Sequence, residues 1–150
     1  MPMSNNQQER AEPVIACNLG AIAPADLDAH VALAQAVFSP RTVLEIKEVA
    51  QGYAFRLPLE TAMLQKTIDF IANERLCCPF FTFTLVVGEA LWLELSGSDE
   101  VKAYLKSNLI QAVETGTFPT VEELEAAYAT STGSVNMRAP IGQAGAGEQE

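Results

Sequence analysis

The sequence predicts an α+β fold, in which helices lie mainly on one face of an antiparallel sheet of four or five strands. Two pairs of apolar segments with period-two alternation are typical of hairpins. A segment with helical spacing precedes each pair. The 150 residues suit one domain with a hydrophobic core. The expected order of elements is β-α-β-β-α-β-β-α-α.

The N-terminal part predicts a short strand followed by a helix. The strand spans residues 14–19 and is closed by Gly20. The helix opens with Pro24 and an acid in its first turn, and Ser39-Pro40 stops it. Its apolar positions repeat at helical spacing: Leu27, Val31, Ala34 and Phe38. The only histidine, His30, falls at the edge of that face, where a partly exposed structural residue is favoured over a ligand.

Two hairpins are expected on either side of a second helix. Residues 43–49 and 53–57 flank a turn at 50–52, and residues 81–87 and 91–95 flank a turn at 88–90. In the last strand Trp92 falls on the face opposite the leucines. We therefore expect a covering element or an apolar surface patch there, and favour a subunit interface, in a homodimer.

The helix between the hairpins begins near Thr61, and its expected core positions are Leu64, Ile68 and Ile71. Pro79 cannot extend a helix and biases the preceding residue away from helical angles. The helix should therefore end at about Cys77.

The C-terminal part predicts two helices and a tail. Val101, Leu105, Leu109 and Ala112 mark a helix that ends at Gly116. Thr120 to Glu123 form a capping box for a short helix. The expected organisation is a disordered leader at 1–12, a single α+β domain at 13–129 and a disordered tail at 130–150.

Composition narrows the function classes. The net charge is −10 and no basic cluster is visible, which disfavours nucleic-acid binding. No apolar run approaches the roughly 18 to 20 residues that a membrane span needs. No glycine-rich phosphate loop supports a nucleotide cofactor. Three cysteines, two of them adjacent, make no disulfide framework, so we expect a cytoplasmic protein.

The end of the second helix carries the candidate chemistry. Glu74 lies three residues before Cys77 and four before Cys78, so its carboxylate can approach either sulfur. The helix C-terminus and Glu74 both favour neutral thiols, which disfavours a spontaneously reactive nucleophile. A soft cation that displaces the thiol protons could still be accommodated.

Three functions remain open for this cluster. In the first, Cys77, Cys78 and Cys17 bind a soft metal or metalloid ion such as mercury(II), arsenite, copper(I) or zinc(II), with Glu74 or His30 as a further ligand. In the second, less favoured, the two thiols act as acceptors in an enzyme and Glu74 moves a proton. In the third, the cysteines are buried apolar residues of an interaction module. Sulfurs within about 4 Å of one another favour the metal site.

The run Glu74-Arg-Leu-Cys77-Cys78-Pro79-Phe80 resembles a group of small, largely uncharacterised bacterial proteins that share a Glu-x-x-Cys-Cys-Pro-Phe motif. The resemblance spans about residues 14 to 110 and includes an Ala-Cys pair near the N-terminus, here at Cys17. Some members occur in metal-resistance contexts. The resemblance implies no particular reaction, and it indicates Cys17, Cys77 and Cys78 as the positions to test.

Overall fold

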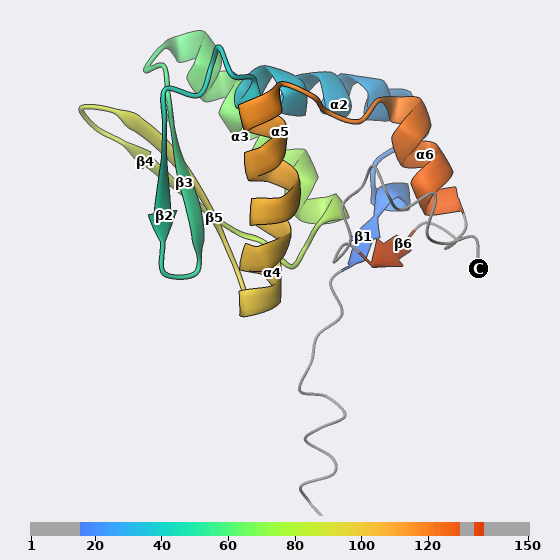
Figure 1. The fold of residues 1–150 in the computed structure, drawn as a ribbon. Helices are drawn as coiled ribbons and strands as arrows, with labels where there is room; N and C mark the ends of the chain where they lie inside the picture. Colours follow the sequence, from blue (N-terminus) through green and yellow to red (C-terminus); the bar gives the residue numbers. More distant parts are fainter. Residues whose placement is uncertain (1–15, 130–133, 137–150) are drawn as a thin grey trace, which may run out of the picture.

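The computed structural model describes residues 16–129 and 134–136. The predicted leader at 1–12, and residues 130–133 and 137–150 of the predicted tail, lie outside the described residues. Within them the α+β fold is confirmed (Figure 1). The domain boundaries stay a prediction.

The main sheet is formed by the two expected hairpins. Strands β2 (Glu45–Val49) and β3 (Gly52–Leu57) form the first hairpin, and β4 (Thr82–Val87) and β5 (Leu91–Ser96) form the second. The strand order is β2-β3-β5-β4, and every neighbouring pair is antiparallel. The hairpins therefore join through their second strands, as β3 and β5 pair along their full length.

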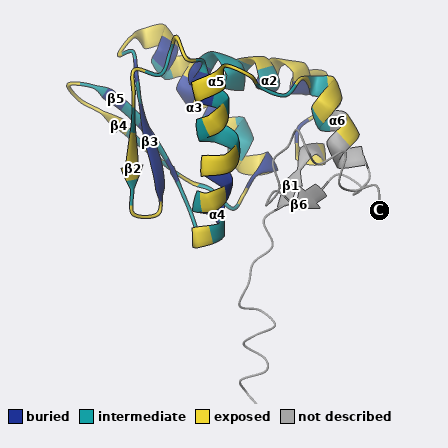
Figure 2. Ribbon diagram, viewed as in Figure 1, coloured by how far each residue is buried: buried dark blue, intermediate teal, exposed yellow. Residues whose placement is uncertain are grey.

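Helices cover one face of this sheet (Figure 1). They are α2 (Pro24–Phe38), α3 (Thr61–Cys77) and a continuous helix built from α4 (Asp99–Tyr104), a π-helical segment η2 (Leu105–Ile110) and α5 (Gln111–Thr115). Phe55 and Leu93, which pair across β3 and β5, are fully buried beneath them. Figure 2 shows β3 as a deeply buried strand and the edge strand β2 as mostly exposed.

The helix ends follow the sequence signals. Gly116 adopts a left-handed conformation with φ of 75° and terminates α5, as the C-terminal glycine predicts. The capping box is present, since the Thr120 amide donates to the Glu123 carboxylate and the Glu123 amide donates to the Thr120 hydroxyl. It starts α6 (Val121–Ala129).

The first strand does not join the main sheet. β1 (Ala16–Asn18) is followed by a 3₁₀ turn, η1 (Leu19–Ala21), and pairs with β6 (Ser134–Asn136) as a separate two-stranded sheet. Of the four or five strands expected, the main sheet thus contains four. β6 falls in a segment for which the sequence indicates no strand, because three residues carry too little periodicity to be recognised.

The buried face of α3 differs in part from the predicted one. Ile68, expected in the core, is 47% exposed, and the buried positions are instead Met63, Thr67, Phe70 and Cys77. Thr67 can lie inside because its hydroxyl donates to the Met63 carbonyl at 2.8 Å, which satisfies its only donor. Leu64 and Ile71, the other two predicted core positions, are partly buried and pack against the core, so the helix is rotated toward Thr67 and Phe70 and only Ile68 of the predicted face is exposed.

Trp92 lies on the face of the sheet opposite the buried leucines, as expected, and is partly buried. It is paired with Val86 on β4, which is 51% exposed, and the Lys47 ammonium lies 4.5 Å from the centre of its ring. Among the described residues no helix is long and apolar enough to span a membrane.

Gly52 provides a direct test of the β3–β5 pairing. A Cβ atom at this position would lie 1.9 Å from the backbone oxygen of Leu95, so Gly52→Ala should lower the free energy of unfolding by about 3 kcal/mol. Gly88→Ala is the matched control, because its Cβ meets nothing within 4 Å, and should change stability by less than about 0.5 kcal/mol. Urea unfolding of both variants checks this. Equal effects would contradict the close approach of the two strands.

Candidate metal centre

The two thiols stand where α3 ends. The helix runs to Cys77, and Cys78 leaves it with φ of −126°, while its amide still donates to the Glu74 carbonyl at 2.7 Å. Pro79 follows and cannot continue the helix. The predicted helix end is confirmed, and it leaves consecutive cysteines on the last turn and the residue after it.

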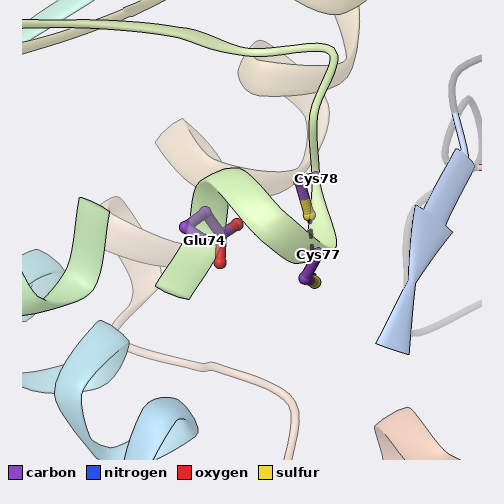
Figure 3. Close-up of side chains that lie close together, drawn as sticks. All are labelled: Glu74, Cys77 and Cys78. Carbon is purple, nitrogen blue, oxygen red and sulfur yellow. Dashed lines mark hydrogen bonds between the residues drawn. The ribbon is translucent and has the colours of Figure 1, made fainter. Parts of the chain in front are cut away.

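Glu74, Cys77 and Cys78 form a compact group of metal-binding side chains (Figure 3). The two Sγ atoms and a carboxylate oxygen of Glu74 all lie within 4.8 Å of one another. The sulfurs are 3.4 Å apart, a contact much longer than the roughly 2.05 Å of a disulfide bond. Both cysteines are buried, at 4% and 2% exposure. The sulfur separation therefore meets the limit of about 4 Å that favours a metal site for this pair.

His30 contacts this group, although its sequence position predicts a partly exposed structural residue. That expectation is wrong, because the side chain is buried, at 6% exposure. Its Nε2 atom lies 2.8 Å from Glu74 Oε1, and its ring stacks on Phe70 at a centroid distance of 5.7 Å. The helical spacing within α2 could not reveal this, since the contact joins residues of two helices that are 44 positions apart along the chain.

The pKa of His30 is raised above its ordinary value of 6.5. Burial is the largest influence and acts in the opposite direction, because it disfavours the charged imidazolium. The hydrogen bond to Glu74 and the charges of Glu74 and Cys77 together outweigh it. Among the described residues the other ring nitrogen, Nδ1, has no hydrogen-bond partner although it is buried.

An apolar pocket adjoins the group. Its volume is about 110 Å³, and its walls come from α2, α3, β5, α4, the π-helical segment and the loops at Phe81 and Phe118. Aromatic rings dominate the lining, including Phe38, Phe70 and Tyr104. Among the described residues of the lining, Glu74 is the one that can carry a charge, so the same residue borders both the pocket and the thiols. Neither the pocket nor the shared position of Glu74 can be read from residue spacing.

Cys17, the third predicted ligand, lies on β1, and β1 packs against α3. The strand that carries it is therefore beside the helix that carries the other thiols. The position of its side chain is outside the described part of the structure, so its contribution stays a prediction.

Comparison with known proteins adds no identity. No family model matches the chain, and neither a curated protein nor a solved structure does. The case for this site therefore depends on its own geometry.

The ion pair between His30 and Glu74 should make the stability of the fold depend on pH. Since the pKa of His30 is raised on folding, the pair stabilises the fold fully below the unfolded pKa of 6.5 and loses this contribution as the pH rises through the folded pKa. His30→Gln keeps a hydrogen-bond donor but cannot become charged, and should cost about 2 kcal/mol in mildly acidic solution.

Urea unfolding of the metal-free protein at a series of pH values measures this difference. The difference in free energy of unfolding between wild type and His30→Gln should become smaller as the solution becomes alkaline. A constant difference would show that the charge of His30 contributes nothing to stability.

Proposed function

We propose that this protein binds a soft metal or metalloid ion through Cys77 and Cys78, with Glu74 and Cys17 as further ligands. The observation that supports the proposal is the cluster itself, in which two sulfurs and a carboxylate lie within 4.8 Å of one another. Thiolates select soft ions such as copper(I) and zinc(II) over magnesium or calcium. The ligand set thus defines the class of ion but not its identity.

Cys17 is proposed as a ligand because a stable tetrahedral site needs four donor atoms. Two adjacent sulfurs rarely close a stable tetrahedral site by themselves. Glu74 supplies a third donor, and a thiol from β1 would supply a fourth, since that strand lies against α3. A site of this kind is formed by one helix end and one strand.

The electrostatics of the helix end favour a cation. The C-terminus of α3 carries partial negative charge and Glu74 adds a carboxylate, which His30 and Arg75 in the last turn partly offset. The helix end and the carboxylate disfavour thiolates in the metal-free protein, whereas a bound cation would offset them and displace the thiol protons. Metal affinity should accordingly rise with pH.

The biological setting is part of the proposal. The Glu-x-x-Cys-Cys-Pro-Phe motif resembles that of small bacterial proteins of which some occur in metal-resistance contexts, which agrees with a role in handling a toxic soft ion. A cytoplasmic location is consistent with it, because a reducing compartment keeps adjacent thiols available.

A second candidate function is an interaction module in which the cysteines are structural. The observation that favours it is the face of the sheet opposite the helices, where Trp92 is partly exposed beside the 51% exposed Val86; we call this pair the patch. A second copy of the chain is the partner we favour for this patch. The two functions are compatible, since the patch and the thiols lie on different faces of the sheet.

Metal binding is tested by native mass spectrometry of the reduced protein with mercury(II), arsenite, copper(I) and zinc(II). At least one ion should bind with one-to-one stoichiometry, and the Cys77→Ser/Cys78→Ser double variant should lose about 100-fold or more in affinity. Glu74→Gln and Cys17→Ser should each lose about tenfold.

Absence of binding, with thiols that react only after denaturation, would refute the metal site. Circular dichroism of each variant shows whether the fold is retained.

The homodimer is tested by sedimentation of wild type and two lysine variants. Val86 and Val87 are both 51% exposed, but Val86 pairs with Trp92 on the open face while Val87 pairs with the buried Leu91. Val86→Lys should weaken a dimer at least tenfold, because it places a charge within the patch, and Val87→Lys should not. A wild-type protein that remains monomeric at high concentration would exclude the dimer.

A further inference from the structure

We propose that the ligand of this site is a trivalent organoarsenical, with arsenic held by Cys77 and Cys78 and its one apolar substituent in the neighbouring pocket. The inference rests on the proposed soft-ion function and narrows it to a chemical class. Three properties of the site lead to it: the separation of the sulfurs, their number, and the pocket beside them.

The sulfur separation suits a bent, pyramidal centre. With bonds of about 2.3 Å to each sulfur, a linear centre needs sulfurs about 4.6 Å apart and a tetrahedral one about 3.8 Å. The 3.4 Å between the two sulfurs of the metal-free site is nearer to the separation of a bent centre than to that of a linear one. Trivalent arsenic forms three pyramidal bonds, whereas two-coordinate mercury(II) is linear.

Cys77 and Cys78 suit a centre with two exchangeable positions, so for this ligand neither Glu74 nor Cys17 would be bonded to the central atom. A trivalent arsenical R–As(OH)₂ reacts with two thiols by breaking two As–O bonds and forming two As–S bonds. The two thiol protons leave with the two hydroxides as two molecules of water, and the arsenic remains trivalent. The adduct carries no net charge, which suits sulfurs that are at most 4% exposed. An organomercury cation would use only one of the two thiols.

The third bond of arsenic is to carbon, and the pocket offers a place for this substituent. Glu74 lines the pocket and one of its carboxylate oxygens lies within 4.8 Å of both sulfurs, so this side chain is shared by the pocket and the dithiol, although neither cysteine lines the pocket. The rest of the lining is largely aromatic and aliphatic, and the Glu74 carboxylate is already engaged by His30 at 2.8 Å. A cavity of about 150 Å³ holds benzene in another protein. The volume of about 110 Å³ here suits one small ring or a short branched chain.

The π-helical segment contributes to the shape of this pocket. Leu105 and Leu109, both in η2, lie in its wall beside Tyr104 of α4. Short π-helical segments within α-helices occur frequently at functional sites. The irregular turn therefore coincides with the part of the helix that faces the proposed substituent.

The experiment compares phenylarsine oxide with monomethylarsonous acid. Both are titrated against the reduced protein in competition with a free small dithiol, which cancels the intrinsic preference of arsenic for either compound. Native mass spectrometry counts the adducts. The preference for the phenyl over the methyl compound should be about 30-fold greater for the wild-type protein than for the free dithiol. The reason is that the pocket buries about 80 Å² more apolar surface of the phenyl compound.

A filled pocket should abolish this preference. Ala34→Leu projects extra carbons into the cavity from α2, and Leu109→Trp fills it from η2 should the first variant fold poorly. Ala32→Leu is the matched control, because Ala32 is exposed on the same helix and does not line the pocket. The control should keep the 30-fold preference, and both filled variants should still bind the methyl compound.

Two results would overturn the inference. If the protein shows the same preference between the two compounds as the free dithiol does, and Ala34→Leu does not change it, the ligand does not use the pocket. The dithiol would then remain a metal site without a pocket for a substituent. No adduct with either compound, while zinc(II) or copper(I) binds, would exclude arsenic but retain the proposed metal function. If no soft ion binds at all, the proposed function itself fails, and this inference with it.

Discussion

The packing of Phe70 determines where every group of the site lies. Its ring meets Phe38 of α2 at 5.3 Å and Phe83 of β4 at 6.2 Å, both edge to face, and stacks on His30 at 5.7 Å. These contacts set the rotation of α3 about its axis. Glu74 is one helical turn beyond Phe70 and Cys77 is two, so the same rotation turns both toward the interior. If α3 were rotated so that Ile68 was buried, Glu74 would no longer be directed toward the interior.

The site combines groups that are unfavourable separately. A largely buried carboxylate near the negative end of a helix carries a cost in free energy, and so would a thiolate beside it. The 2.8 Å contact between His30 and Glu74 partly offsets the cost of the carboxylate, and the raised pKa of His30 reflects it. The two thiols are almost completely buried, so a ligand that replaces their protons without adding charge would suit them.

Much of the fold could be predicted because it depends on local patterns. Alternation with a period of two residues predicted the hairpins. Pro79 predicted the end of α3, and Gly116 predicted the end of α5. The core face of α3 could not be predicted in this way. Leu64, Ile68 and Ile71 are the more apolar stripe, yet Thr67 is buried in place of Ile68, since hydrogen bonding to Met63 removes the penalty for its hydroxyl. The aromatic contacts of Phe70 then decide the rotation.

For the site, the sequence by itself determined that a carboxylate and two thiols share the last turn of one helix, because that follows from spacing and from a proline that stops the helix. Only the tertiary structure decided that His30 holds this carboxylate, that β1 lies beside α3, and that an aromatic pocket begins at Glu74. These relations join residues on separate elements. Their positions depend on how side chains fill the space between helices and sheet, and no periodicity along one segment records that packing.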